Sequence, residues 1–127
     1  MTEGQEQAFL FQWAGYMRQK YPELELLYHV PNGGKRDLKT AAVLKREGVK
    51  AGVPDLVLPV ARRGYFGLYV ELKVGKNKTS VKQDKWIQAL KEQNYFTQVC
   101  YGWRNAADVI EDYLSGPATE RRKNGSC

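Results

Sequence analysis

Three polar side chains near the middle of the chain have the types and the order that phosphodiester hydrolysis requires. Asp55 follows Pro54 and leads into an apolar run, and Glu71 and Lys73 lie two positions apart in the next apolar run. Mg²⁺ binds through one or two protein carboxylates and keeps several waters, so a converging pair of acids is sufficient. A lysine on the same strand face could offset charge in the transition state. We therefore predict that Asp55 and Glu71 bind Mg²⁺ or Mn²⁺ and that Lys73 is catalytic.

The peptide group between Glu71 and Lys73 offers one more oxygen. The backbone carbonyl of Leu72 would lie between the two side chains, and we expect it to be a further metal ligand. A purely structural interpretation stays open, because Glu-x-Lys pairs are frequent on half-exposed strands and Pro-Asp is a common turn. Order, spacing and context distinguish the motif from a chance match.

The segments that would position these residues alternate between helix and strand. Apolar residues at helical spacing predict a first helix over residues 2–20, and Thr2 with Gln5 can form a capping box at its start. Strands are expected at 24–30 and 56–60, before a longer strand at 65–74 in which Glu71 and Lys73 share one face.

The rest of the chain continues the same alternation. Helices are predicted at about 37–47, after Ser80 and after Asn105, and a fourth strand is predicted at 95–101. The order predicts an α/β fold with a mixed four-stranded sheet flanked by helices, in which the strands near Asp55 and Glu71 pair antiparallel.

Composition bounds the organisation of the chain. Its 127 residues, 43% of them hydrophobic, are enough for one domain, which we place at residues 1–116, followed by a disordered basic tail at 117–127. No apolar run is long enough to cross a bilayer and the N-terminus does not have the order of a signal peptide, so we expect no membrane partner and a cytoplasmic location.

Charge and metal-binding residue types narrow the partners. The net charge of +6 favours a polyanionic partner, although a basic surface can also serve solubility alone. Cys100 and Cys127 do not have metal-ligand spacing, and His29 is the only histidine. A bound metal would therefore have to be held by oxygen ligands.

Two basic segments could contact phosphates. Asn32, Lys35 and Arg36 belong to the Pro-Asn-Gly-Gly turn after the first strand, whose amides could receive a phosphate. His29 beside this turn could be a structural residue at a strand end or a catalytic group. The second segment is a polar loop and helix start, in which we expect a DNA-binding rim rather than a merely solvated loop; its basic residues are Lys76, Lys78 and Lys82.

Several motifs in order resemble one known family. These motifs are PNGGKR, LKREGVKAGVPD, GVPDLVLPV, GLYVELKVGK, SVKQDKW and a closing DYL. Together they are similar to the VRR-NUC domain nucleases of the PD-(D/E)xK superfamily, from residue 2 to about residue 114. The resemblance implies a restriction-endonuclease-like core and a deoxyribonuclease activity dependent on Mg²⁺ or Mn²⁺.

The resemblance also implies roles for particular residues. It puts the aspartate, glutamate and lysine of the superfamily on Asp55, Glu71 and Lys73, and a catalytic glutamine on Gln83. Ser80-x-x-Gln83 is equally a capping-box pattern, so Gln83 has a structural alternative. The family also carries an acidic residue in its first helix, which matches Glu3 best, with Glu6 as the rival.

Stand-alone members of this family suggest the biological setting. By resemblance we expect a phage or prophage endonuclease that cuts branched DNA, such as flaps and four-way Holliday junctions, in a bacterial cytoplasm. A homodimer is expected because two active sites are needed to cut two strands symmetrically. The alternatives are a nucleic-acid-binding module without catalysis and a subunit of a replication or recombination complex.

Overall fold

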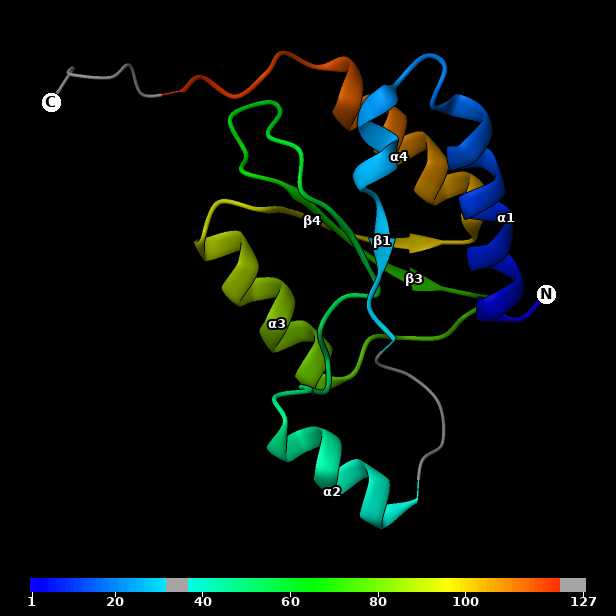
Figure 1. Cartoon of the computed structure of the whole chain (residues 1–127), viewed down its shortest axis with the longest axis vertical. Coiled ribbons are helices and arrows are strands. Elements are labelled where there is room, and N and C mark those ends of the chain that lie inside the picture. The colour runs from blue at the N-terminus through cyan, green and yellow to red at the C-terminus, as the bar shows by residue number, and fades with distance from the viewer. Residues whose placement is uncertain (32–36, 122–127) are drawn as a thin grey trace, which may run out of the picture.

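A computed structural model describes residues 1–31 and 37–121 of the chain (Figure 1). The helices and strands follow the predicted alternation of helix and strand. Their bounds are α1 (Glu3–Met17), a 3-10 helix η1 (Pro22–Leu26), β1 (Tyr28–His29), α2 (Leu38–Arg46), β2 (Leu56–Leu58), β3 (Leu68–Lys73), α3 (Val81–Glu92), β4 (Phe96–Tyr101) and α4 (Trp103–Ser115).

The four strands form one mixed sheet in the order β1-β2-β3-β4. β1 with β2 and β2 with β3 are antiparallel, whereas β3 and β4 are parallel. The α/β class, the mixed sheet and the antiparallel pairing around Asp55 and Glu71 are therefore confirmed. A parallel pair requires a crossover, and α3 provides it between β3 and β4.

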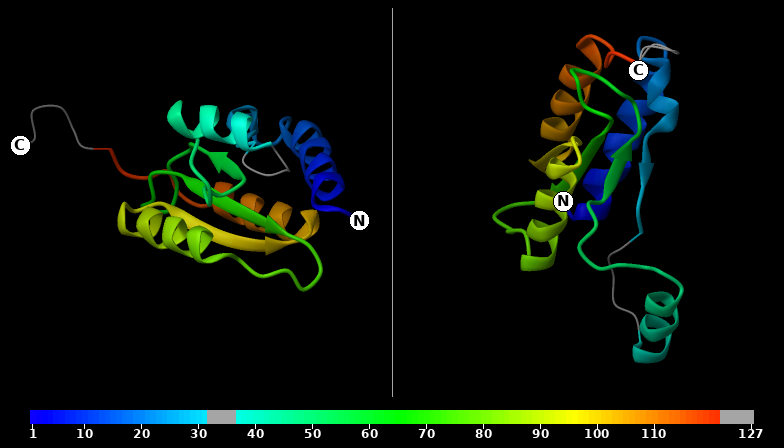
Figure 2. Two further views of the ribbon diagram at one scale, coloured as in Figure 1. Left: turned by 90° about the horizontal axis from the view of Figure 1, so that it is seen from below. Right: turned by 90° about the vertical axis from the view of Figure 1, so that its left-hand side faces the viewer.

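One face of the sheet is apolar and carries the core. Because side chains alternate along a strand, Leu68, Val70 and Leu72 of β3 point to the same face. They pack with the buried residues of α1 and α4, which lie side by side (Figures 1 and 2). Glu71 and Lys73 consequently occupy the opposite face, where burial leaves them only 2% and 9% exposed.

All four strands are shorter than predicted. β3 covers Leu68–Lys73 where we expected 65–74, and β4 covers Phe96–Tyr101 where we expected 95–101. The segment expected to be a strand over 24–30 begins as η1, because Pro22 at the first helical positions favours helical backbone. The strand expected over 56–60 ends at Leu58, immediately before Pro59, which has no N–H to donate to a ladder.

Helix starts that depend on local hydrogen bonds agree with the sequence. The Thr2 and Ser80 capping boxes are both formed, and Asp37 caps α2. α4 instead begins at Trp103, before the expected cap at Asn105. In the described part of the chain, no helix has both the length and the apolar character needed to cross a bilayer.

The segment after α4 returns to the loop between β2 and β3. Arg63 N–H donates to the Pro117 carbonyl over 2.8 Å, and Thr119 N–H donates to the Ala61 carbonyl over 3.2 Å. These bonds hold residues 117–119 against the domain, where we expected a disordered tail to begin. The rest of that predicted tail, residues 122–127, lies outside the described residues.

Candidate active site

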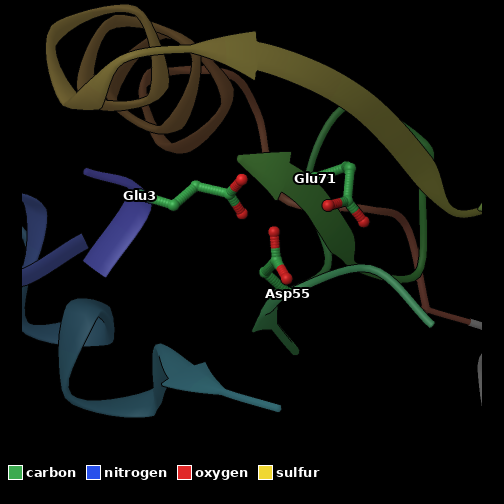
Figure 3. Close-up of side chains that lie close together, drawn as sticks. All are labelled: Glu3, Asp55 and Glu71. Carbon is green, nitrogen blue, oxygen red and sulfur yellow. The ribbon is translucent and has the colours of Figure 1, made fainter. Parts of the chain in front are cut away.

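Three acidic side chains from three different elements converge on the polar face of the sheet. Glu3 lies in the first turn of α1, Asp55 immediately precedes β2, and Glu71 lies on β3. One carboxylate oxygen from each lies within 4.8 Å of the other two, and Figure 3 shows the groups pointing toward one another. The antiparallel register that pairs Leu56 with Val70 brings the preceding Asp55 beside Glu71.

Asp55 is held in place by hydrogen bonds to two strands. Its Oδ2 accepts the backbone N–H of Leu72 over 2.9 Å, which ties the end of β2 to β3. Its backbone carbonyl accepts the N–H of Val30 over 2.7 Å and lies 3.1 Å from Nδ1 of His29. The carboxylate is thus oriented by the fold before any ligand binds. The proposed role of the Leu72 carbonyl stays a prediction.

Glu71 is the most buried acid of the cluster. Its Oε1 has no hydrogen-bond partner, and its Oε2 lies 3.9 Å from Lys73 Nζ. Burial raises the pKa of Glu71 to about 9, and a hydrogen bond with Asp55 and the charge of Asp55 act in the same direction, whereas Lys73 opposes them. Burial, followed by the Asp55 charge, also raises the pKa of Glu3. Without a bound cation, the three carboxyl groups therefore carry less than their full negative charge near neutral pH.

These donors fit a hard divalent cation. The cluster contains only carboxylates, which suit Mg²⁺ and Mn²⁺ better than soft metals. A buried carboxylate oxygen without a partner is costly for the folded protein unless a cation or a donor satisfies it. Glu71 Oε1 is such an oxygen.

A cavity of about 600 Å³ contains the predicted catalytic residues. Its lining brings Lys73 and Gln83 together with the three acids, although they come from β3, α3, α1 and the segment before β2. Gln7, to which we assigned no role from the sequence, also lines the cavity. Gln7 lies one helical turn after Glu3, and this spacing could have indicated that the two side chains lie on the same face of α1. His29 lines the cavity too, beside the Asp55 carbonyl.

Gln83 fulfils its structural role at this cavity. Its side-chain oxygen accepts the N–H of Ser80 over 2.9 Å, and its own N–H donates to Ser80 Oγ over 3.1 Å. The capping box occupies the amide oxygen and leaves the amide nitrogen as a possible donor. The capping and catalytic interpretations of Gln83 are therefore compatible.

The structure describes only some of the residues that we expect to bind DNA. Lys76 and Lys78 are exposed in the loop after β3, and Lys82 is exposed in the first turn of α3. Asn32, Lys35 and Arg36 lie outside the described residues.

The first helix contains two acids with different surroundings. Glu6 does not join the cluster in which Glu3 lies; its Oε2 accepts the backbone N–H of Trp103 over 2.7 Å. Trp103 is the first residue of α4, whose N-cap Gly102 makes no side-chain cap hydrogen bond. Glu6 therefore caps α4 from another helix, which explains why α4 begins earlier than the sequence predicts.

Glutamine substitutions should separate the two acids. Glu6→Gln should lower the free energy of unfolding by about 1 kcal/mol, because the charged cap on α4 is weakened. Glu3→Gln should leave stability nearly unchanged but weaken Mn²⁺ binding about tenfold or more. Urea unfolding and calorimetric Mn²⁺ titration of both variants test this; equal effects on Mn²⁺ binding would contradict it.

Gly52 permits close contact between the loop before Asp55 and the start of α3. Its φ is +92°, and a Cβ placed on it would lie 2.8 Å from the carbonyl carbon and oxygen of Lys82. Gly52→Ala should lower the free energy of unfolding by about 2 to 4 kcal/mol, through backbone strain and displacement of the loop.

Gly48→Ala is the matched control for this substitution. Gly48 has a similar φ of +102°, but nothing lies within 4 Å of its added Cβ. The control should lose only the strain contribution, about 1 to 2 kcal/mol. Equal urea midpoints for the two variants would rule out a role for the close approach to Lys82.

The chain is similar to known proteins along most of its length. A family model described as the VRR-NUC domain matches residues 2–103. The chain is similar to a solved structure titled "VRR_NUC domain protein", with 32% sequence identity and a TM-score of 0.78 over 97% of this chain and 98% of that chain. No curated protein matches it. The family match includes every residue of the acidic cluster, together with Lys73 and Gln83.

Proposed function

Since the chain belongs to the VRR-NUC family, whose domains are generally nucleases, we propose that it is a metal-dependent endonuclease that hydrolyses DNA phosphodiester bonds. The observation that carries this proposal is the gathering of three carboxylates within 4.8 Å beside Lys73. Metal-dependent cleavage needs carboxylates that converge on one position and a positively charged side chain beside them. The fold brings these residues together at one position, although they come from three separate elements.

The acidic cluster and the neighbouring residues would have different roles in catalysis. Glu3, Asp55 and Glu71 would hold Mg²⁺ or Mn²⁺, with the Leu72 carbonyl as a further ligand. When bound, such an ion supplies positive charge to the phosphate and makes water more acidic. Lys73 would place a second positive charge at the scissile phosphate, and the Gln83 amide nitrogen would donate to the phosphate or to the attacking water.

DNA would be held by backbone contacts. Lys76, Lys78 and Lys82 would contact phosphates on one side of the cavity, and Asn32, Lys35 and Arg36 would do so next to β1. Such contacts position DNA without reading its sequence. The domain has few residues beyond its core elements, which favours recognition of branched shapes, such as flaps and Holliday junctions, over a fixed recognition sequence.

A homodimer would present two active sites to two strands. We propose this assembly for a phage or prophage enzyme that cuts both strands of a junction. Light scattering at increasing protein concentration tests it, and a mass that stays monomeric throughout would exclude the dimer.

Cleavage of labelled DNA tests the main proposal. Linear duplex, flap and four-way-junction DNA are incubated with Mg²⁺, Mn²⁺ or EDTA. We expect cutting only with metal, and faster cutting of the branched substrates. DNA binding without cutting under all metal conditions would instead favour a binding module, and equal cutting in EDTA would indicate a contaminating nuclease.

A further inference from the structure

A second cavity, of about 560 Å³, lies between α2 and α3. We call it the Trp86 pocket; its main lining residues are Trp86, Leu44, Val49, Lys45, Lys50 and Lys82. Leu44 and Lys45 come from α2, and Lys82 and Trp86 share one face of α3 because they are four residues apart. Its volume is within the range of small-molecule sites.

The Trp86 pocket lies next to the acidic cavity. Lys82 in the wall of the first is followed directly by Gln83 in the wall of the second. A smaller cavity of about 290 Å³ shares Trp86 with the Trp86 pocket and Val53 with the acidic cavity. A chain molecule bound at the acids could therefore extend into the Trp86 pocket.

The lining combines a flat aromatic ring with positive charge. Trp86 is half-buried, Leu44 and Val49 are apolar, and three lysines reach the same hollow. None of the described residues that line it is acidic. Nucleotides match this chemistry, because the base of a nucleotide can stack on an indole ring while the phosphates of the strand pair with ammonium groups.

We propose that the Trp86 pocket binds an unpaired nucleotide next to the scissile phosphate. A base inside a duplex is stacked on its neighbours and paired, so only an unpaired base can present its face to Trp86. The inference rests on the proposed nuclease function and deepens it. The enzyme would select DNA in which a strand leaves the duplex at the cleavage point.

A second protein copy fits the Trp86 pocket less well. α2 stands apart from the sheet and none of its residues is buried, so its apolar side chains could be covered by a partner (Figure 1). However, a protein partner would have to desolvate Lys45, Lys50 and Lys82, and lysine is depleted in the cores of protein interfaces. Phosphates would compensate these charges.

Binding to tailed and blunt DNA tests the pocket. Labelled duplex with a short single-stranded tail, at the 5′ or the 3′ end, is compared with the blunt duplex by anisotropy, with Ca²⁺ in place of Mg²⁺. Trp86→Leu should weaken binding of tailed DNA by about tenfold and of blunt duplex by about twofold or less, as expected for loss of one stacking ring. Trp86→Phe keeps a ring and should retain most of the preference.

A lysine pair provides an independent arm that does not disturb packing. Lys45→Ala with Lys50→Ala should weaken tailed DNA binding and reduce the slope of log K against log salt by about two. Lys20→Ala with Lys91→Ala removes the same charge from exposed positions elsewhere and should leave the preference for tails unchanged. Thermal unfolding and circular dichroism establish that each variant is folded.

The outcomes separate this inference from the proposed function. If wild-type protein cuts these substrates with Mg²⁺ or Mn²⁺ but all variants keep the preference for tailed DNA, the pocket assignment is wrong and the nuclease assignment stands. A dimer that becomes a monomer in Trp86→Leu would show that a second copy covers the pocket. If the wild type cuts nothing, the proposed function fails together with the inference.

Discussion

Asp55→Asn should reduce metal-dependent DNA cleavage by about a thousandfold or more, with little loss of stability. Asparagine keeps a side-chain oxygen that can accept the Leu72 N–H, now received by Asp55 Oδ2 over 2.9 Å. The substitution removes the negative charge at the centre of the acidic cluster, and loss of one group that organises transition-state charge costs catalysis on this scale. Initial rates on flap DNA with Mn²⁺ and urea unfolding measure the two effects separately.

Glu120→Gln is the matched control for Asp55→Asn. It also removes one negative charge, but Glu120 is exposed in the segment after α4. Its cleavage rate should stay within about twofold of the wild type, since exposed charge changes have small effects. Cleavage by Asp55→Asn at the rate of this control would remove Asp55 from the active site.

Glu71→Gln should stabilise the metal-free protein at alkaline pH. The pKa of Glu71 is about 9 in the folded protein, against 4.5 for an ordinary glutamate, so the folded state holds a proton that the unfolded chain releases. This contribution is complete below about pH 4.5 and is lost as pH rises through about 9. Near pH 9 we expect the free energy of unfolding of the variant to exceed that of the wild type by about 2 to 4 kcal/mol. This is less than the free energy that corresponds to the whole pKa shift, because neighbouring charges readjust when Glu71 ionises.

Unfolding curves in EDTA between pH 5 and about pH 9 test this expectation. The wild type should lose stability relative to Glu71→Gln across this range, and Glu120→Gln should follow the wild type. The variant should also lose metal-dependent cleavage, so gain of stability and loss of activity would come from the same carboxylate. Parallel stability curves for wild type and Glu71→Gln would show that Glu71 ionises normally.

Metal binding should release the proton that Glu71 holds in the metal-free protein. Because a carboxylate must be deprotonated to bind a cation, Mn²⁺ binding should release a proton from Glu71 near neutral pH. Mn²⁺ affinity should therefore rise with pH in this range. Calorimetry in buffers of different ionisation enthalpy measures the release, and a buffer-independent heat would contradict the raised pKa.

Features that depend on neighbouring residues were predictable from the sequence. The capping boxes of α1 and α3 are local hydrogen bonds over three residues, and the alternation in β3 places Glu71 and Lys73 on one face regardless of what covers them. The sheet class followed because periodicity separates strands from helices. Strand bounds were less predictable; after Pro22 and before Pro59, proline geometry overrides an apolar run and shortens the expected strands.

Features that depend on distant residues required the fold. Glu3 and Glu6 are both acids in the first turn of α1, and only the packing of α1 against α4 shows that Glu6 reaches the Trp103 N–H. The raised pKa of Glu71 likewise follows from burial and from Asp55, which no local pattern contains. The adjacency of the Trp86 pocket to the acidic cavity results from the loop at Gly52 packing on α3.

The α/β class and the candidate set of Asp55, Glu71 and Lys73 could be predicted without coordinates, because residue type, spacing and strand alternation are local properties of the chain. That Glu3, and not Glu6, lies with Asp55 and Glu71 within 4.8 Å became clear only from the folded chain. Convergence of charges from three elements depends on how the antiparallel strands register and how α1 packs on the sheet, and both are set by long-range contacts.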